Sequence, residues 1–288
     1  MRGAKTANYA CTATNSRRSS NNEIGMITLY QFGNSVCCQK VRITMREKRL
    51  EWASVEINLF KNEQYAAAYL KLNPSGVVPT LIIDERVIIE STLICEFLDD
   101  TFKDFSLMPE DALGRATVRQ WSKMVDEGLH EGVGEISFSA MFRERMKGMS
   151  PEARRVRFEN VGDPRRRDRF MSTFEHGAHS PWVRYGVAAF EKAFRRLEAT
   201  LSDRGPWIMG DAPTLADVNL MPYVARLHFL GLLDLWIDKR PRVQAWWELV
   251  QRWPSYQAGL VTPMLDKEIT EMATHGPSIR NDIKSLLP

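Results

Sequence analysis

The sequence predicts a small α/β domain followed by a larger all-helical domain. Over roughly the first hundred residues, short apolar runs rich in β-branched residues alternate with helix-like segments. After Pro109 no convincing strand pattern remains, and amphipathic helical repeats take its place. We therefore expect an α/β domain at 26–103, a helical domain at 104–262 and a C-terminal tail at 263–288.

The α/β part is expected to follow the order β-α-β-α-β-β-α. The expected elements are a strand at 27–32, a helix at 36–48, a strand at 51–59, a short helix at 64–72, a strand pair flanking Asp84-Glu85, and a helix that starts at Ser91. The tight connection between "TLIID" and "RVIIES" predicts an antiparallel hairpin, whereas a βαβ unit gives parallel strands. The sheet should therefore be mixed and four-stranded.

Helical periodicity dominates the second part of the chain. It covers residues 111–142, 183–201, 214–233 and 241–253. The third of these segments opens with Thr214 and has Asp217 three residues later, which predicts a capping box with a carboxylate near the positive helix end. The fourth has proline in its first turn and stops before another proline.

A basic insertion at about 143–180 fits neither pattern well. Residues 143–170 hold ten Arg or Lys and five Asp or Glu, including "PRRRDR" at 164–169. A nucleic-acid patch would need aromatic residues interleaved with the arginines, and these are missing. A solvated, partly helical insertion is the favoured interpretation, and a basic lid that attracts an anionic ligand is the alternative.

The first 25 residues carry the whole net charge of +3, because four basic residues face Glu23 alone. Their Ser, Asn, Thr and Ala content, without apolar periodicity, predicts a disordered leader. A transit peptide would also be basic and Ser-rich, but arginine is sparse here and no amphipathic face is evident. A flexible leader, or a start codon placed ahead of Met26, is favoured.

Charge and cysteine content narrow the function classes. The net charge is too small to imply a nucleic-acid partner, and no apolar run approaches the roughly 20 residues that span a bilayer. Four cysteines, at positions 11, 37, 38 and 95, do not form a disulfide framework and indicate a reducing, cytoplasmic setting. The five histidines and Cys95 form no cluster with metal-ligand spacing, so no metal is expected.

The stretch "FGNSVCCQK" (32–40) places Ser35 and two cysteines between a strand and a helix. The cysteines could be a redox pair, metal ligands, or neighbours of an active serine. A disulfide exchanger normally has Cys-x-x-Cys at such a turn, and here serine replaces the first cysteine. Adjacent cysteines bridge only with strain. A hydroxyl at this position can donate to a thiolate, which the helix dipole also stabilises.

Two further stretches could bind a ligand. In "NPSGVVPT" (73–80), Val78-Pro79 would expose backbone if its bond were cis, although locally an ordinary trans proline is favoured. In "ESTLIC" (90–95), Ser91 is a natural helix N-cap. A helix N-terminus also binds carboxylates, and Glu90 can pair with an ammonium group. Together they could hold the α-amino and α-carboxyl groups of an amino acid.

These three stretches, in this order, resemble the cytosolic glutathione transferase superfamily. The carrying residues are "LYQFGNSVCCQKVRI", then "LNPSGVVPTL", then "ES" opening "STLICEFLDDTF", and later "TLADV". The resemblance covers about residues 26–260. Within the superfamily the chain is most similar to bacterial β-etherase-type enzymes, which use glutathione to cleave lignin aryl ethers. The features are "VIIESTLICEFLDDTF", "WSKMVDE" and the insertion with "ENVGDPRRRDRF".

The resemblance implies a thioredoxin-like N-terminal domain that carries a glutathione site, and a helical domain that supplies most of the second-substrate pocket. By this resemblance Ser35 holds the catalytic hydroxyl, with Asn34 and Cys37 in reserve. The glutathione-binding residues that it implies are Gln64 for the glycyl carboxylate, Val78 with cis-Pro79 for the cysteinyl part, and Glu90 with Ser91 for the γ-glutamyl end.

The expected reaction is attack of the glutathione thiolate on a hydrophobic electrophile, with a β-aryl ether as one candidate. Phe32, Trp121 and Met124 are the predicted apolar pocket wall. Glutathione would be a co-substrate, with no metal, and the resemblance implies a homodimer. Two alternatives stay open: a thiol transferase that uses Cys37 or Cys38, and a non-enzymatic relative that binds proteins.

Overall fold

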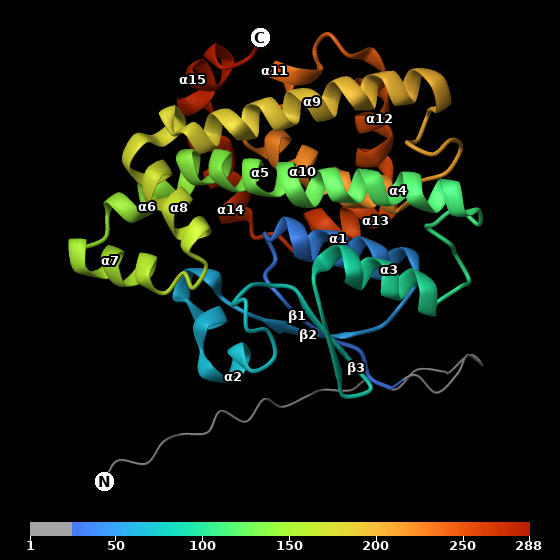
Figure 1. Ribbon diagram of the computed structural model, residues 1–288, viewed down its shortest axis with the longest axis horizontal. Helices are drawn as coiled ribbons and strands as arrows, with labels where there is room; N and C mark the ends of the chain where they lie inside the picture. Colours follow the sequence, from blue (N-terminus) through green and yellow to red (C-terminus); the bar gives the residue numbers. More distant parts are fainter. Residues whose placement is uncertain (1–24) are drawn as a thin grey trace.

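This computed structural model describes residues 25–288, and Figure 1 shows their arrangement. The sheet lies at one end of the molecule, helices α1 (Val36–Glu47) and α3 (Ser91–Thr101) lie against it, and the helical domain lies on their other side. The predicted leader and Cys11 lie outside the described residues, except for Gly25 at the leader's last position.

The sheet has four strands in the order β2-β1-β3-β4. The strands are β1 (Thr28–Gln31), β2 (Ala53–Glu56), β3 (Thr80–Ile83) and β4 (Arg86–Ile89). Strands β1 and β2 are parallel, whereas β3 is antiparallel to both β1 and β4. The predicted mixed sheet and hairpin are therefore confirmed. Asp84 and Glu85 connect the hairpin with positive φ angles of 48° and 64°, as a two-residue turn requires.

Helices α1 (Val36–Glu47) and α3 (Ser91–Thr101) pack side by side between the sheet and the helical domain. Because α1 is covered on both sides, two of its charged residues, Lys40 and Arg42, are buried. Arg42 is 1% exposed and donates to the carbonyls of Gly33 and Gly259, each over 2.7 Å. Arg42 therefore connects the turn before α1 with the C-terminal part of the helical domain.

The predicted short helix at 64–72 is broken into three turns. Two 3-10 turns, Leu59–Lys61 and Glu63–Tyr65, precede the one-turn helix α2 (Ala67–Leu70). Within 64–72 the break is at Ala66, whose backbone is extended with φ of −64° and ψ of 138°. The two 3-10 turns are separated by Asn62, which adopts a left-handed conformation with φ of 60°. Asparagine tolerates this region better than most residues.

The helical domain is built from α4 to α15, including short π-helical and 3-10 turns. Its main helices are α4 (Ala112–Met124), α5 (His130–Ser137), α6 (Arg143–Lys147), α7 (Pro151–Glu159), α8 (Pro164–His176), α9 (Pro181–Arg204), α10 (Leu215–Phe229) and α12 (Pro241–Arg252). The predicted helical run at 111–142 is continuous through two π-helical turns, Val125–Leu129 and Phe138–Phe142.

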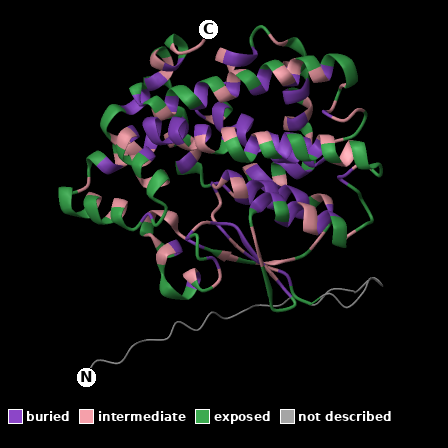
Figure 2. Cartoon of the chain, viewed as in Figure 1, coloured by how far each residue is buried: buried purple, intermediate pink, exposed green. Residues whose placement is uncertain are grey.

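Helix α10 is the centre of this domain, and Figure 2 shows the buried residues gathered around it. The predicted capping box is present: Asp217 accepts from the backbone N–H of Thr214 over 2.9 Å. The same buried carboxylate accepts from the indole N–H of Trp246 over 2.9 Å. Helices α5 and α9 meet where a Cβ on Gly132 would lie 2.7 Å from Cα of Gly186, so both positions need glycine.

The basic insertion is helical, and it forms α6, α7 and α8 at one side of the molecule (Figure 1). The residues predicted as a C-terminal tail also form helices, namely α14 (Asp266–His275) and α15 (Arg280–Ser285), and their buried side chains include Met272 and Ile283.

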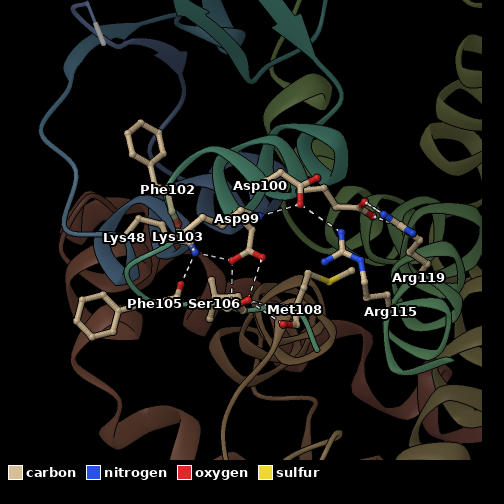
Figure 3. A network of polar contacts seen from close by, with 12 residues as sticks. Lys48, Asp99, Asp100, Phe102, Lys103, Phe105, Ser106, Met108, Arg115 and Arg119 are labelled. Carbon is tan, nitrogen blue, oxygen red and sulfur yellow. Dashed lines mark hydrogen bonds and ion pairs between the residues drawn. The ribbon is translucent and has the colours of Figure 1, made fainter. Parts of the chain in front are cut away.

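A polar network joins the two domains at the ends of α1 and α3 (Figure 3). Lys48 and Asp99 form an ion pair in which both side chains are at most 1% exposed. Lys48 also donates to the carbonyl of Phe102 over 2.9 Å, and Asp99 accepts from the backbone N–H of Leu107 over 2.7 Å. These contacts fix the connection that leads from α3 into the helical domain.

Candidate active site

A cavity of about 700 Å³ lies between the two domains. The α/β domain lines it with the turn before α1, the 59–65 turns, the loop before β3 and the start of α3. The helical domain lines it with α5 to α8 and with Arg226 of α10. Six phenylalanines make one part of the wall apolar: Phe32, Phe60, Phe138, Phe142, Phe158 and Phe170.

Ser35 is the N-cap of α1, and its hydroxyl oxygen accepts from the backbone N–H of Cys38 over 3.4 Å. A hydroxyl that accepts in this way keeps its own hydrogen for donation. The first backbone N–H groups of a helix have no intrahelical acceptor, and those of Val36 and Cys37 lie at this cavity wall. The turn therefore offers one hydroxyl and a helix N-terminus to an anionic atom.

Cys37 also lines the cavity, and its sulfur contacts two residues of the helical domain. Its sulfur is 3.5 Å from Nδ1 of His130 and 3.8 Å from the hydroxyl of Tyr223. Burial would raise the pKa of this thiol, but the charge and hydrogen bond of His130, with Lys40 and Ser91, outweigh burial and lower the pKa to about 6. The Cys37 charge in turn raises the pKa of His130.

Cys37 is only partly buried, and His130 keeps an exposed face, so both groups are in reach of a ligand in the cavity. That exposure also means that water moderates their electrostatic interaction. A thiol of lowered pKa that remains accessible is the environment of a reactive cysteine.

Lys40 lies beneath Cys37 and favours its thiolate, while its charge opposes protonation of His130. Its side chain is completely buried, and its ammonium donates to Thr92 over 2.6 Å and to Asp126 over 3.1 Å. These contacts link α1 to α3 and to the start of the π-helical turn after α4. The fixed positive charge favours a thiolate at Cys37.

The other two described cysteines are in a different environment. Cys38 and Cys95 are both buried, and burial raises the pKa of Cys38 to about 12 and that of Cys95 to about 11. A thiol with such a pKa carries almost no thiolate near neutral pH, so it is a poor nucleophile. Of the two cysteines considered for a thiol transferase, the structure supports Cys37 and disfavours Cys38.

The residues expected to bind glutathione all line this one cavity. The Val78-Pro79 peptide bond is cis, as the family resemblance implied and local sequence evidence did not. Gln64 is 7% exposed, and its side-chain oxygen has no hydrogen-bond partner among the described residues. Glu90 and Ser91 lie at the start of α3.

The cap position of α3 differs from the prediction. Glu90, and not Ser91, is the N-cap residue, and its side chain makes no cap hydrogen bond. Glu90 has φ of 68° and ψ of 110°, a combination that costs a residue with a side chain about 1–3 kcal/mol. Ser91 instead lies against Cys37, where its hydrogen bond lowers the pKa of that thiol.

Asn34, the reserve candidate, has a structural contact. Arg226 is buried and donates to the Asn34 carbonyl over 2.6 Å and to its side-chain oxygen over 2.7 Å. The side-chain oxygen of Asn34 is therefore occupied by Arg226.

Of the three residues predicted for the pocket wall, Phe32 lines the cavity, whereas Trp121 and Met124 pack in the core instead. Phe32 lines the cavity and packs edge-on against Phe60. Trp121 is 1% exposed in the core, with the guanidinium of Arg196 4.3 Å from its ring centre, and Met124 packs against the same core. Helical spacing alone does not distinguish a core face from a cavity face, which explains the difference.

Sequence reasoning missed His130, Lys40 and Tyr223. His130 and Tyr223 are 93 and 186 residues from Cys37, and no local motif marks them.

Within the described residues, no group of three or more His, Cys, Asp or Glu side chains could hold a metal ion. No helix among residues 25–288 is long and apolar enough to cross a membrane.

Comparison with known proteins gives the family. The family model described as the glutathione S-transferase N-terminal domain matches residues 34–101, and the C-terminal domain model matches residues 157–248. Glutathione S-transferase 1 of Dianthus caryophyllus is 34% identical over 205 residues, which cover 71% of this chain and 79% of that protein. The chain belongs to the glutathione S-transferase family.

Other relatives of this glutathione S-transferase are named for several different activities. Protein LigF of Sphingobium sp. is 38% identical over 128 residues, so the match spans 44% of this chain and only half of LigF. Maleylacetoacetate isomerase of Pseudomonas aeruginosa is 29% identical over 80% of this chain and 93% of that protein. The crystal structure of the β-etherase LigF matches with a TM-score of 0.74 and 28% identity, over 83% of this chain and all of that one.

Proposed function

We propose that this glutathione S-transferase uses the glutathione thiolate to attack an electrophilic carbon of an aromatic substrate. The proposal rests on one observation. Three stretches that are separate in the sequence, with Ser35, Val78-Pro79 and Glu90–Ser91, line the same cavity. Five phenylalanines that contact one another, Phe32, Phe60, Phe138, Phe142 and Phe170, make another part of the same cavity wall apolar. A site for a polar thiol therefore adjoins a site for an aromatic group.

Glutathione would bind along the α/β domain. Glu90 would pair with the γ-glutamyl ammonium, and Ser91 and the start of α3 would receive its carboxylate. The backbone of Val78 would pair with the cysteinyl part, as in the family that the chain belongs to. This orientation directs the sulfur to the N-terminus of α1, beside Ser35.

Activation of the sulfur would come from donors at the α1 N-terminus. The free hydrogen of the Ser35 hydroxyl would donate to the thiolate, and the backbone N–H groups at the start of α1 would add to it. Each of these interactions favours the ionised sulfur over the thiol, which lowers the pKa of bound glutathione.

For a β-aryl ether, the thiolate would attack the carbon next to a ketone. The new sulfur–carbon bond replaces the carbon–oxygen bond, and the aryloxide leaves with the electron pair and takes a proton from water. The similarity to the β-etherase LigF supports this substrate class. Since another relative is named an isomerase, a maleyl substrate belongs in the same assay panel.

Thiol transfer is the second candidate, and the environment of Cys37 favours it. The Cys37 thiolate would attack the disulfide bond of a glutathione mixed disulfide, form a Cys37–glutathione disulfide and release the other thiolate. A second glutathione thiolate would then attack this bond, which frees Cys37 and releases oxidised glutathione. The lowered pKa of Cys37 and its contact with His130 support this cycle.

Substitutions separate the two candidates. We expect Ser35→Ala to lower kcat/KM for an aryl ether about a hundredfold, because it removes one donor to the reacting sulfur. Cys37→Ser should leave that reaction within a few-fold of the original and abolish reduction of a mixed disulfide. Cys38→Ser is the control for the neighbouring position. The transferase proposal is wrong if Ser35→Ala has no effect on any glutathione-dependent reaction in a panel of aryl ethers, halides, epoxides, disulfides and maleyl compounds.

We also propose a cytoplasmic homodimer. The three described cysteines are free, in keeping with a reducing compartment, and the family resemblance supports the dimer. Sedimentation equilibrium of the purified chain measures the oligomeric state, and a monomer at micromolar concentration contradicts this proposal.

A further inference from the structure

The arginine-rich insertion contributes directly to the cavity wall. Helices α6, α7 and α8 place four arginines there: Arg145, Arg157, Arg166 and Arg169. Because the cavity also contains the expected glutathione-binding residues, the insertion lies over the site and not on a remote surface.

Two of these arginines are neutralised by carboxylates. Arg145 pairs with Glu271, and its guanidinium lies 4.0 Å from the ring centre of Phe60. Arg169 pairs with Glu131 over 2.7 Å and with the buried Glu135 over 3.3 Å. Their charges are therefore satisfied within the protein.

The other two, Arg157 and Arg166, have no carboxylate within ion-pair distance among residues 25–288. Arg157 donates to the carbonyl of Phe60 over 3.3 Å and to the side-chain oxygen of Asn62 over 3.1 Å. Burial, together with the nearby charge of Arg145, lowers the pKa of Arg157. A half-buried guanidinium that has only neutral partners is poorly compensated.

Arg166 is in a similar position on α8. It donates to the carbonyl of Ser75 over 3.3 Å, and its buried Nε has no hydrogen-bond partner in the described structure. Asp163 lies nearby, but it caps α8 by accepting from the backbone N–H of Arg166. The side chain of Arg166 thus retains an unused donor at the cavity.

Gln64 supplies a second unused polar group on the same wall. Its buried side-chain oxygen has no hydrogen-bond partner among residues 25–288. Its neighbour Tyr65 packs against Gly76, next to the Ser75 carbonyl that Arg166 contacts. Unused buried donors and acceptors in a cavity are expected to be satisfied by what binds there. A guanidinium group without an ion pair favours a planar anion, and a carboxylate fits the parallel N–H donors of each guanidinium.

We propose that Arg157 and Arg166 of the insertion form a carboxylate-binding subsite that clamps a ligand between the helical domain and the 60–76 loops. Two ligands could carry that carboxylate: glutathione itself, through its glycyl end, or the aromatic second substrate. The first source rests on the proposed function and the second does not. The subsite makes α7 and α8 determinants of specificity for an acidic ligand.

The test measures binding of acidic and neutral ligand pairs by calorimetry. The variants are Arg157→Gln and Arg166→Gln, which keep polarity and remove the charge. The matched controls are Arg155→Gln and Arg167→Gln, on the same two helices but away from the cavity. One ligand pair is glutathione and its glycyl monoethyl ester, and the other is biphenyl-4-carboxylate and its carboxamide.

We expect each cavity variant to weaken the acid of one pair by about tenfold or more, and to leave its neutral partner within twofold. The pair that responds identifies the source of the carboxylate. The controls should bind all four ligands as the original chain does, and melting temperatures check that each variant folds.

Three outcomes overturn the subsite: acid and neutral ligands weakened equally, no change in any ligand, or an original chain that binds neither acid better than its neutral partner. The last comparison needs no variant, so misfolding of a variant cannot conceal failure. If the original chain binds the biphenyl acid but no form of glutathione, the proposed function fails and the subsite stands.

Discussion

Cys37 and His130 are two accessible groups of the cavity that shift each other's pKa, and they come from different domains. The sulfur and Nδ1 are 3.5 Å apart, and Lys40 adds a fixed positive charge beneath them. A thiolate and an imidazolium therefore stabilise each other. Whether or not Cys37 takes part in the main reaction, this environment predicts that it reacts readily with electrophiles.

The pH dependence of Cys37 alkylation tests this environment. A thiol whose pKa is lowered to about 6 is ionised above that pH, so the rate with iodoacetamide should rise with a midpoint near 6 and level off by neutral pH. Mass spectrometry follows Cys37, and Cys38, whose pKa is raised to about 12, is the internal control.

Replacing His130 should shift that midpoint upward. His130→Ala removes the charge and hydrogen bond that oppose burial, so alkylation of Cys37 should slow at neutral pH and accelerate only at alkaline pH. His179→Ala is the matched control, because His179 is 76% exposed in its side chain and contacts Asp282 instead. An unchanged midpoint in His130→Ala contradicts the proposed ion pair.

Replacing Glu90 with glycine should make the protein more stable and weaken its binding of glutathione. Glu90→Gly relieves a backbone with φ of 68°, so the free energy of unfolding should rise by about 1 kcal/mol, while KM for glutathione should rise about tenfold. Glu85→Gly is the control: it relieves φ of 64° in the hairpin turn and should leave KM unchanged. Urea unfolding and steady-state kinetics measure the two effects, and equal KM changes in both variants contradict a ligand role for Glu90.

At the residue scale the sequence was most informative where the candidate site residues lie inside local motifs. Ser35, Val78, Pro79, Glu90 and Ser91 each belong to a short stretch with its own signature, and all five line the cavity. His130 and Tyr223 have no such signature, because their contact with Cys37 exists only after the helical domain packs on α1. Such tertiary contacts cannot be obtained from spacing along the chain.

At the scale of elements, the junction of α1 and α3 is held by a buried ion pair. Asp99→Asn leaves the ammonium of Lys48 uncompensated in the core, so we expect a loss of about 3–5 kcal/mol in the free energy of unfolding. Asp100→Asn is the matched control on the next residue. The Asp100 side chain is 51% exposed and its ion pairs are with surface residues, so this substitution should cost about 1 kcal/mol or less in the free energy of unfolding.

Urea denaturation followed by tryptophan fluorescence measures both losses. Equal, small losses in the two variants would mean that Lys48 finds other partners, such as the carbonyls of Phe102 and Phe105. The account of the domain junction would then be wrong.

Elements with strong local signals were predicted well. The capping box at Thr214, the hairpin at Asp84-Glu85 and the long helix α9 all appear where sequence patterns placed them. The insertion was predicted as solvated and partly helical, with a basic lid as the alternative. Its helices present arginines to the cavity, and this orientation depends on how α7 and α8 pack against the α/β domain.

At the scale of the whole molecule, function depends on the two domains being held together. The α/β domain supplies the residues proposed to bind glutathione, and the helical domain supplies His130, four of the six phenylalanines and the arginines. Arg42 and Arg226 each donate from one domain to a carbonyl of the other, so the cavity has a defined shape. The fold class followed from the sequence, but the lining of this cavity did not, because it is assembled from segments far apart in the chain.

The central claim is that this cavity binds glutathione with its sulfur at the N-terminus of α1. A crystal structure of the chain with bound glutathione tests it most directly. We predict the sulfur within about 3.5 Å of the Ser35 hydroxyl oxygen and the γ-glutamyl group at Glu90 and Ser91. Glutathione bound elsewhere, or with its sulfur remote from both Ser35 and Cys37, would contradict the account.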